Sequence, residues 1–197
     1  MIIIKQKLGN DYMYFLWYNS SMKVRQAASS DMERIMKIEE SAFIPNIQET
    51  YQTFSCRLTT YPQGFLVLED DKGTVQGYFS SELWEGLPHN NKVFILDHDP
   101  AKVHKTDGKL LYVSSLALMS GLQGRGLGKL FFKECLSQVL KDSPQIEQIV
   151  LIVSQEWGAA CHIYEDLGFK AVRQIPGFFP SDVIPGGADG IVMIKNV

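Results

Sequence analysis

Residues Leu111–Val139 read LYVSSLALMSGLQGRGLGKLFFKECLSQV and predict a β-strand, a glycine-rich turn and an α-helix in direct succession. The apolar run Leu111–Met119 suits a buried strand, and the apolar residues after the turn recur with a period near 3.6. Glycines let a backbone approach a ligand closely, and the first N–H groups of a helix have no partner within it. Because the helix dipole favours negative charge at that end, the stretch predicts a phosphate or pyrophosphate site.

Three phosphate-binding motifs can be compared with this turn. A Walker A loop is excluded because Leu130 stands where that motif needs Ser or Thr. A dinucleotide fingerprint is excluded because the glycines of Gly124–Gly128 have the spacing G-x-G-x-G. The pattern Gln/Arg-x-x-Gly-x-Gly/Ala fits Gln123–Gly128 in full, and this string resembles the coenzyme A pyrophosphate loop of the GCN5-related N-acetyltransferases (GNAT). The alternative is a glycine-rich turn that serves packing alone.

A second stretch downstream supports the same resemblance. Ile146–Val153 is a buried strand by composition, and a helical pattern follows that ends at Gly168, a residue type favoured just after a helix. The string Ile163–Phe169, IYEDLGF, is similar to the second GNAT signature, a tyrosine-bearing helix that ends in Leu-Gly-Phe. Together the two signatures imply an α/β GNAT fold with a mixed sheet of about six to seven strands, flanked by about four helices and splayed at the CoA site.

The resemblance implies that acetyl-CoA is the co-substrate, that no metal is needed, and that a primary amine attacks the thioester directly. Backbone N–H groups of the glycine turn would hold the pyrophosphate, with charge added by Arg125 or Lys129. The predicted contacts are Gln123, Gly124, Arg125, Gly126, Leu127, Gly128, Lys129 and Trp157. The pantetheine arm would pair with Leu116, Ala117 and Leu118, and the N–H of Leu118 would stabilise the oxyanion.

Tyr164 matches the family tyrosine that protonates the leaving thiolate. A phenol with a pKa near 10 can protonate a thiolate whose acid has a pKa near 8.5. The alternative is that Tyr164, which lies on the apolar stripe of its helix, only packs in the core.

The chain departs from the family pattern at two positions. The N-terminal acetyltransferase subgroup often has a glutamate where Ile152 stands, and the family usually has asparagine at Trp157. The aromatic and proline run Ile175–Pro180 is nevertheless similar to that subgroup, which includes the ribosomal-alanine type. The acceptor is therefore expected to be a peptide N-terminus or a small amine, and a site without a strong base favours α-amines, whose pKa is near 8. The candidate bases are Glu82, Asp97, His98 and His104.

The rest of the chain follows the family order. Met22–Ala28 predicts the first strand, and Ser30 with Glu33 predicts a helix N-cap. Further predictions are a helix over residues 46–60, a hairpin over 65–83 and a C-terminal hairpin of 170–174 with 190–195. The long connection Ser81–Lys109 is predicted to form a substrate wall, with a solvated insertion as the alternative.

Composition limits the remaining possibilities. Length suits one domain over 22–197, preceded by an N-terminal extension, 1–21, of unclear role. A net charge of −3 argues against nucleic-acid binding, and no apolar run predicts a membrane span. The chain has three cysteines, which are predicted to be free thiols rather than a disulfide framework. Free thiols indicate a reducing compartment, so the expected location is the cytoplasm. The resemblance also allows a homodimer, and the competing function is a non-catalytic acyl-CoA-binding or sensing module.

Overall fold

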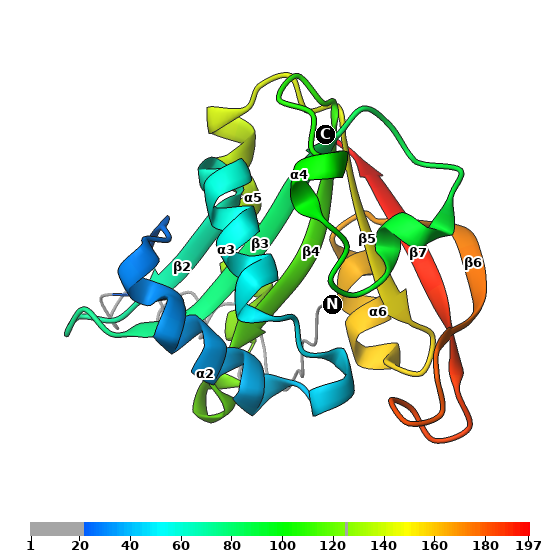
Figure 1. Ribbon diagram of the computed structural model, residues 1–197, viewed down its shortest axis with the longest axis horizontal. Helices are drawn as coiled ribbons and strands as arrows, with labels where there is room; N and C mark the ends of the chain where they lie inside the picture. The colour runs from blue at the N-terminus through cyan, green and yellow to red at the C-terminus, as the bar shows by residue number, and fades with distance from the viewer. Residues whose placement is uncertain (1–21, 125) are drawn as a thin grey trace.

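The computed structural model describes residues 22–124 and 126–197, so the predictions for 1–21 and for Arg125 lie outside the described residues. Seven strands form one mixed sheet in the order β1-β2-β3-β4-β5-β7-β6 (Figure 1). The strands are β1 (Lys23–Gln26), β2 (Phe65–Glu69), β3 (Val75–Trp84), β4 (Leu110–Leu118), β5 (Gln148–Ser154), β6 (Lys170–Phe179) and β7 (Ala188–Asn196). The helices are α2 (Met32–Ala42), α3 (Tyr51–Thr60), α4 (Pro100–Val103), α5 (Leu127–Asp142) and α6 (Gly158–Asp166).

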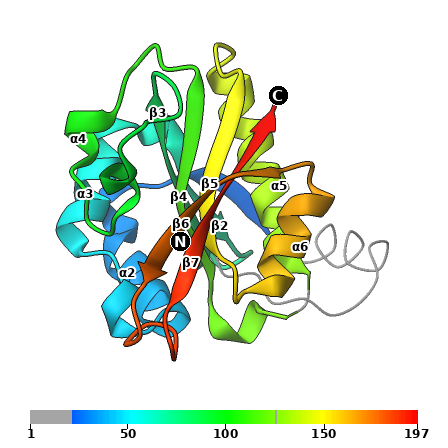
Figure 2. The ribbon, with the colours of Figure 1, turned by 90° about the vertical axis from the view of Figure 1, so that its right-hand side faces the viewer.

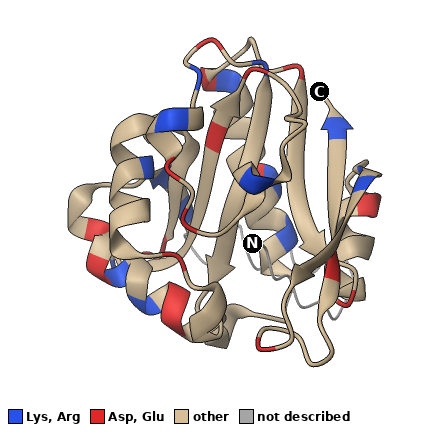
Figure 3. Ribbon diagram, turned by 45° about the vertical axis from the view of Figure 1, so that its right-hand side comes forward, with Lys and Arg blue, Asp and Glu red and all other residues tan. Residues whose placement is uncertain are grey.

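The helices cover both faces of the sheet. Figure 2 shows α2, α3 and α4 on one side and α5 and α6 on the other. This arrangement explains the continuous apolar run of β4, whose residues are all buried because helices lie over both of its faces. Figure 3 shows most charged residues on helices and loops, with few on the central strands. The α/β fold class predicted from the sequence is confirmed.

The sheet divides at its parallel pair. β4 and β5 are paired only from Leu110 opposite Gln148 to Tyr112 opposite Val150, and the two strands diverge beyond that point. A β-bulge in β4 lies at the same place, because Ser81 is opposite Val113 whereas Ser80 is opposite Ser115. A bulge increases local twist and bends its strand. The predicted splay of the sheet is therefore present, with Ser114 as the extra residue of the bulge.

The predicted start of α2 was wrong. Ser29–Asp31 form a 3-10 turn, the helix begins at Met32, and Asp31 rather than Ser30 occupies the N-cap. The Asp31 carboxylate accepts the N–H of Ala28 at 2.8 Å and pairs with Arg25 at 2.7 Å. This ion pair to a neighbouring strand, which the local sequence does not reveal, fixes the helix start.

Two further boundaries differ from prediction. The second helix begins at Tyr51 instead of residue 46, because Pro45–Ile47 form a separate 3-10 turn and Thr50 Oγ1 caps the helix by accepting the N–H of Thr53 at 3.2 Å. β6 continues to Phe179, where it still pairs with β7, instead of ending at residue 174. The aromatic run that follows residue 174 thus belongs to a strand and not to a loop.

Phe131 tests the packing of α5 against the sheet, because its side chain is 0% exposed in the largest core cluster. We expect Phe131→Ala to lower the free energy of unfolding by about 3–5 kcal/mol in urea titrations, since it leaves a cavity in a well-packed core. Tyr51→Ala is the control, because Tyr51 is 55% exposed. If the two variants unfolded at the same urea concentration, this result would contradict the packing of Phe131 in the core.

Candidate active site

The glycine turn places backbone amides at the start of the longest described helix. Gly124 and Gly126 have φ angles of 75° and 76°, in the left-handed region that glycine adopts without strain. Gly126 is the N-cap of α5, and none of the described side chains caps this helix end. A Cβ at Gly124 would meet no atom of the described residues within 4 Å. The geometry fits the diphosphate of CoA, which the motif predicted.

Two contacts fix this turn to its surroundings. Gln123 Nε2 donates to the carbonyl of Leu118 at 2.9 Å and so ties the turn to the end of β4. Lys129 Nζ pairs with Asp166 Oδ2 at 3.1 Å and joins α5 to α6. Lys129 must therefore exchange or share this partner before its charge can serve a bound phosphate.

At the splay, the end of β4 has buried main-chain groups that face away from β3. The N–H of Met119 donates to Gln76 at the β3 side, at 2.9 Å. Because N–H groups alternate along an antiparallel strand, the N–H of Leu116 and that of Leu118 point away from β3. The carbonyl of Leu118 accepts the side chain of Gln123 and not a β3 amide, which agrees with this alternation. We call Leu116–Leu118 the open edge of β4.

Tyr164 combines burial with an unsatisfied hydroxyl. Its side chain is 0% exposed and makes edge contacts with Phe132 and Phe169, at centroid distances of 5.8 and 5.9 Å. Its hydroxyl has no hydrogen-bond partner among the described residues. Burial raises the pKa of this phenol well above its usual value, so it stays protonated. An unpaired buried hydroxyl is costly, which makes it suited to a ligand that supplies an acceptor.

A cavity of about 420 Å³, which we call the splay cavity, opens where β4 and β5 separate. Tyr112 and Ser114 of β4 and Ile152 of β5 line its floor. Three further segments supply the remaining walls. They are the segment before α3 (Asn46, Ile47 and Glu49), Phe94–Leu96 from the connection after β3, and the end of β6 with the connection that follows it (Phe178, Phe179, Pro180 and Val183). Since Phe94–Leu96 belong to the predicted substrate wall, the structure supports that interpretation of the long connection.

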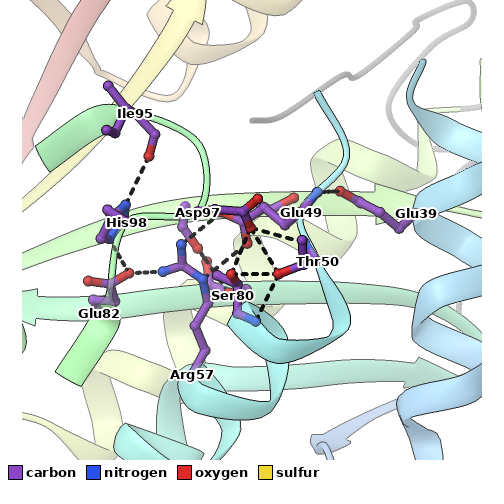
Figure 4. Close-up of polar contacts among 12 residues, drawn as sticks. Glu39, Glu49, Thr50, Arg57, Ser80, Glu82, Ile95, Asp97 and His98 are labelled. Atoms are coloured by element: carbon purple, nitrogen blue, oxygen red, sulfur yellow. Dashed lines mark hydrogen bonds and ion pairs between the residues drawn. The ribbon is translucent and has the colours of Figure 1, made fainter. Parts of the chain in front are cut away.

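A buried charge network lies beside the splay cavity (Figure 4). Arg57 of α3 is 1% exposed and binds Glu49 through two bonds, Nε to Oε2 at 3.1 Å and Nη2 to Oε1 at 2.8 Å. Its Nη1 contacts the carboxylate of Glu82, which also accepts the indole N–H of Trp84 at 3.1 Å. Arg57 thus links the loop that precedes α3 to strand β3.

His98 completes this network from the connection after β3. Its Nε2 lies 2.8 Å from Glu82 Oε1, and its Nδ1 lies 3.1 Å from the carbonyl of Ile95. Burial and the charge of Arg57 lower the pKa of His98. A neutral imidazole has only one N–H, which can donate to only one of these two oxygen atoms. Both contacts are therefore hydrogen bonds only when the pair of Glu82 and His98 carries one further proton, on either residue.

The candidate bases named from the sequence all have structural partners. Glu82 and His98 belong to the buried network, and neither lines the splay cavity. Asp97 accepts three bonds at the start of α3, including one from Thr53 Oγ1 at 2.7 Å. His104 Nδ1 accepts the N–H of Leu83 at 3.3 Å.

Glu49, which sequence reasoning missed, is the carboxylate that does line the cavity. Ile152 occupies the wall where the subgroup glutamate was expected. Nothing local marks Glu49, because Arg57 positions it only in the folded chain.

The other predicted contact, Trp157, lies at the N-cap of α6. Its ring packs against Phe179 at 5.1 Å, which links α6 to the end of β6.

The cysteines are free thiols, on α3, α5 and α6. Within residues 22–124 and 126–197, no group of His, Cys, Asp or Glu is arranged to hold a metal ion, and no helix is long and apolar enough to cross a membrane.

Arg57 is expected to be essential for stability, because its removal leaves two buried carboxylates without their cation. We expect Arg57→Ala to reduce the free energy of unfolding by about 3–5 kcal/mol in urea. Lys109→Ala is the control, since Lys109 pairs with Glu147 at the surface and both side chains are more than 60% exposed; it should unfold like the wild type. A wild-type midpoint for Arg57→Ala would show that the network contributes little.

Glu39 is expected to make stability depend on pH. Burial raises the pKa of this carboxyl from 4.5 to about 7, while hydrogen bonds from Tyr78 and the N–H of Glu49 oppose the shift. Between these values the folded state holds a proton that the unfolded state releases, so rising pH costs stability, by roughly 3 kcal/mol in total.

The variant Glu39→Gln should remove this dependence. Urea unfolding at pH 5 and pH 7.5 should therefore show Glu39→Gln gaining stability relative to the wild type as the pH rises. Glu40→Gln, an exposed neighbour on the same helix, should follow the wild type. If Glu39→Gln and Glu40→Gln respond to pH alike, Glu39 is not the group responsible.

Comparison with known proteins agrees with this geometry. Residues 89–177 match the model of the acetyltransferase (GNAT) domain, a segment that includes β4, the glycine turn, α5, β5 and α6. No curated protein matches the chain by sequence. When three-dimensional structures are compared instead, many solved structures match the chain.

Three solved structures illustrate the shared fold. The loading GNATL domain of CurA from Lyngbya majuscula has a TM-score of 0.73 at 16% identity, over 89% of this chain and 97% of that one. The GphF GNAT-like decarboxylase in complex with isobutyryl-CoA has a TM-score of 0.72 at 19% identity, over 88% and 98%. The ribosomal-protein-S18-alanine N-acetyltransferase from Escherichia coli has a TM-score of 0.65 at 16% identity, over 89% and 94%. The chain therefore carries a segment that matches the GNAT domain and has the GNAT fold, which confirms the resemblance first seen in its two signatures.

Proposed function

We propose that this protein is an acetyl-CoA-dependent N-acetyltransferase, in which a primary amine attacks the thioester directly. The observation that carries the proposal is the buried hydroxyl of Tyr164, which has no hydrogen-bond partner within residues 22–124 and 126–197. It lies on α6, beside α5, whose uncapped N-terminus forms the glycine turn. A ligand held by that turn and extended along the split sheet would give Tyr164 the partner it lacks.

In this proposal, three parts of the chain bind acetyl-CoA. Backbone amides from Gly124 to Lys129 hold the diphosphate, and Arg125 is proposed to add charge there. The open edge of β4, Leu116–Leu118, pairs with the pantetheine arm as a further strand would. The N–H of Leu118 then donates to the thioester oxygen, where negative charge develops during attack.

Tyr164 has the role of general acid. Because its pKa is raised by burial, it carries its proton when acyl transfer begins. Donation of that proton to the sulfur as the C–S bond breaks avoids a free thiolate charge in this low-dielectric surrounding, where an unpaired charge is costly. The packing contacts with Phe132 and Phe169 then orient the ring, so core packing and catalysis are compatible.

The acceptor in this proposal is a peptide N-terminus or a small amine that enters from the splay cavity. The second candidate is a non-catalytic acyl-CoA-binding module, which is favoured by the apolar Ile152 at the position where the subgroup often has a glutamate. The two functions differ in one measurement: a sensor binds acetyl-CoA but does not accelerate transfer to any amine in a panel.

Tyr164→Phe tests the catalytic role, because it keeps the ring and deletes only the hydroxyl. We expect kcat to fall about ten- to a hundredfold, with the KM for acetyl-CoA nearly unchanged. The assay is release of the CoA thiol in the presence of an amine. Tyr51→Phe, at an exposed position, is the matched control. An unchanged kcat in Tyr164→Phe would remove this residue from the mechanism.

A further inference from the structure

We infer that the splay cavity binds a small primary amine with an apolar body. This inference rests on the proposed function and restricts the chemical class of its acceptor. The cavity floor lies where β4 and β5 part, beyond the last pair of Tyr112 with Val150. A molecule in the cavity therefore reaches the opening of the sheet from the face that carries α2, α3 and α4. The buried Tyr164 approaches from the face that carries α5 and α6.

The walls of the cavity are mainly apolar. Aromatic and aliphatic side chains enclose it from three separate segments, namely Phe94, Ile95, Leu96, Ile152, Phe178 and Val183. Burying apolar surface of a ligand against such walls favours binding in proportion to the area removed from water. A polar or multiply charged acceptor would gain nothing from these walls.

Glu49 gives the cavity a polar end. It is the one charged residue among the described residues that line the cavity. Arg57 occupies one position on each carboxylate oxygen, and a carboxylate offers about four acceptor positions in all. Acceptor positions therefore remain for the N–H groups of an amine, while Arg57 fixes the carboxylate in place.

The size of the cavity and its rim limit the acceptor. A volume of about 420 Å³ lies toward the small end of the range for small-molecule sites. Asn46 Nδ2 donates to Asp182 Oδ2 at 2.8 Å, and this bond joins the segment before α3 to the connection between β6 and β7, two of the segments that line the cavity. We expect a short molecule to fit this volume better than a peptide that continues outward.

Calorimetry with the full chain tests this assignment using phenethylamine and ethanolamine, which carry the same amine on an aromatic or a polar body. We expect phenethylamine to bind at least about tenfold more tightly, because only its ring can use the apolar walls. Equal affinities would overturn the inference, and so would tighter binding of the tripeptide Phe-Ala-Ala than of phenethylamine.

A double variant locates the binding site. Ile95→Ser with Leu96→Ser removes apolar wall at positions that are 50% and 39% exposed, so folding should be preserved. This variant should reduce about tenfold the ratio of the affinity for phenethylamine to the affinity for ethanolamine. Val172→Ser is the control, since Val172 is 48% exposed and lies outside the cavity lining. An unchanged preference in the double variant would overturn the assignment.

Turnover measured on the same samples separates this inference from the proposed function. Selective binding of phenethylamine without acetylation of any amine would support the cavity assignment and refute the transferase. Acetylation of both amines with equal affinities would support the transferase and refute the cavity assignment.

Discussion

The separation of β4 from β5 beyond Tyr112 and Val150 is the constraint on which the candidate site depends. If the pairing continued, the N–H of Leu118 would donate to β5 and would be lost to any ligand. Two features act against that pairing. The bulge at Ser114 changes the twist of β4, and Gln123 occupies the carbonyl of Leu118. Buried backbone groups that no described strand pairs with are costly, which is why this edge suits a bound extended group.

The buried charges account for the walls around that opening. Arg57 holds Glu49, on the segment before α3, and Glu82, on β3, while His98 ties the long connection to Glu82. Three segments far apart in sequence are thereby fixed around one side of the sheet. Replacing such a network by apolar residues often leaves stability unchanged, whereas losing one member is costly. We interpret the network as a device that fixes the positions of loops rather than as a source of net stability.

The parts of the site that were predicted from the sequence are those encoded locally. The glycines of Gln123–Gly128 and the tyrosine of Ile163–Phe169 identify a helix start and a helix face within a few residues. Glu49 and the N-cap position of Asp31 were missed, because the side chain of each is held by an arginine brought near by folding. The late start of α3 has the same kind of cause, since Asp97, which binds Thr50, is far away in sequence. Local patterns thus identify the glycine turn and the tyrosine-bearing helix, whereas the walls of the splay cavity are built from contacts that only the fold creates.

The two faces of the sheet have different chemistry, and this difference bears on how transfer proceeds. The α5 and α6 face presents the glycine turn and a phenol, which suit a phosphate and a thiolate. The opposite face presents apolar walls and Glu49, which suit an amine with an apolar body. Both surfaces reach the place where the strands part, and in the proposed reaction the reacting carbon of the acyl group would lie there. The proposed reaction therefore needs no nucleophilic side chain to carry the acyl group between faces, which is consistent with direct attack rather than a covalent enzyme intermediate.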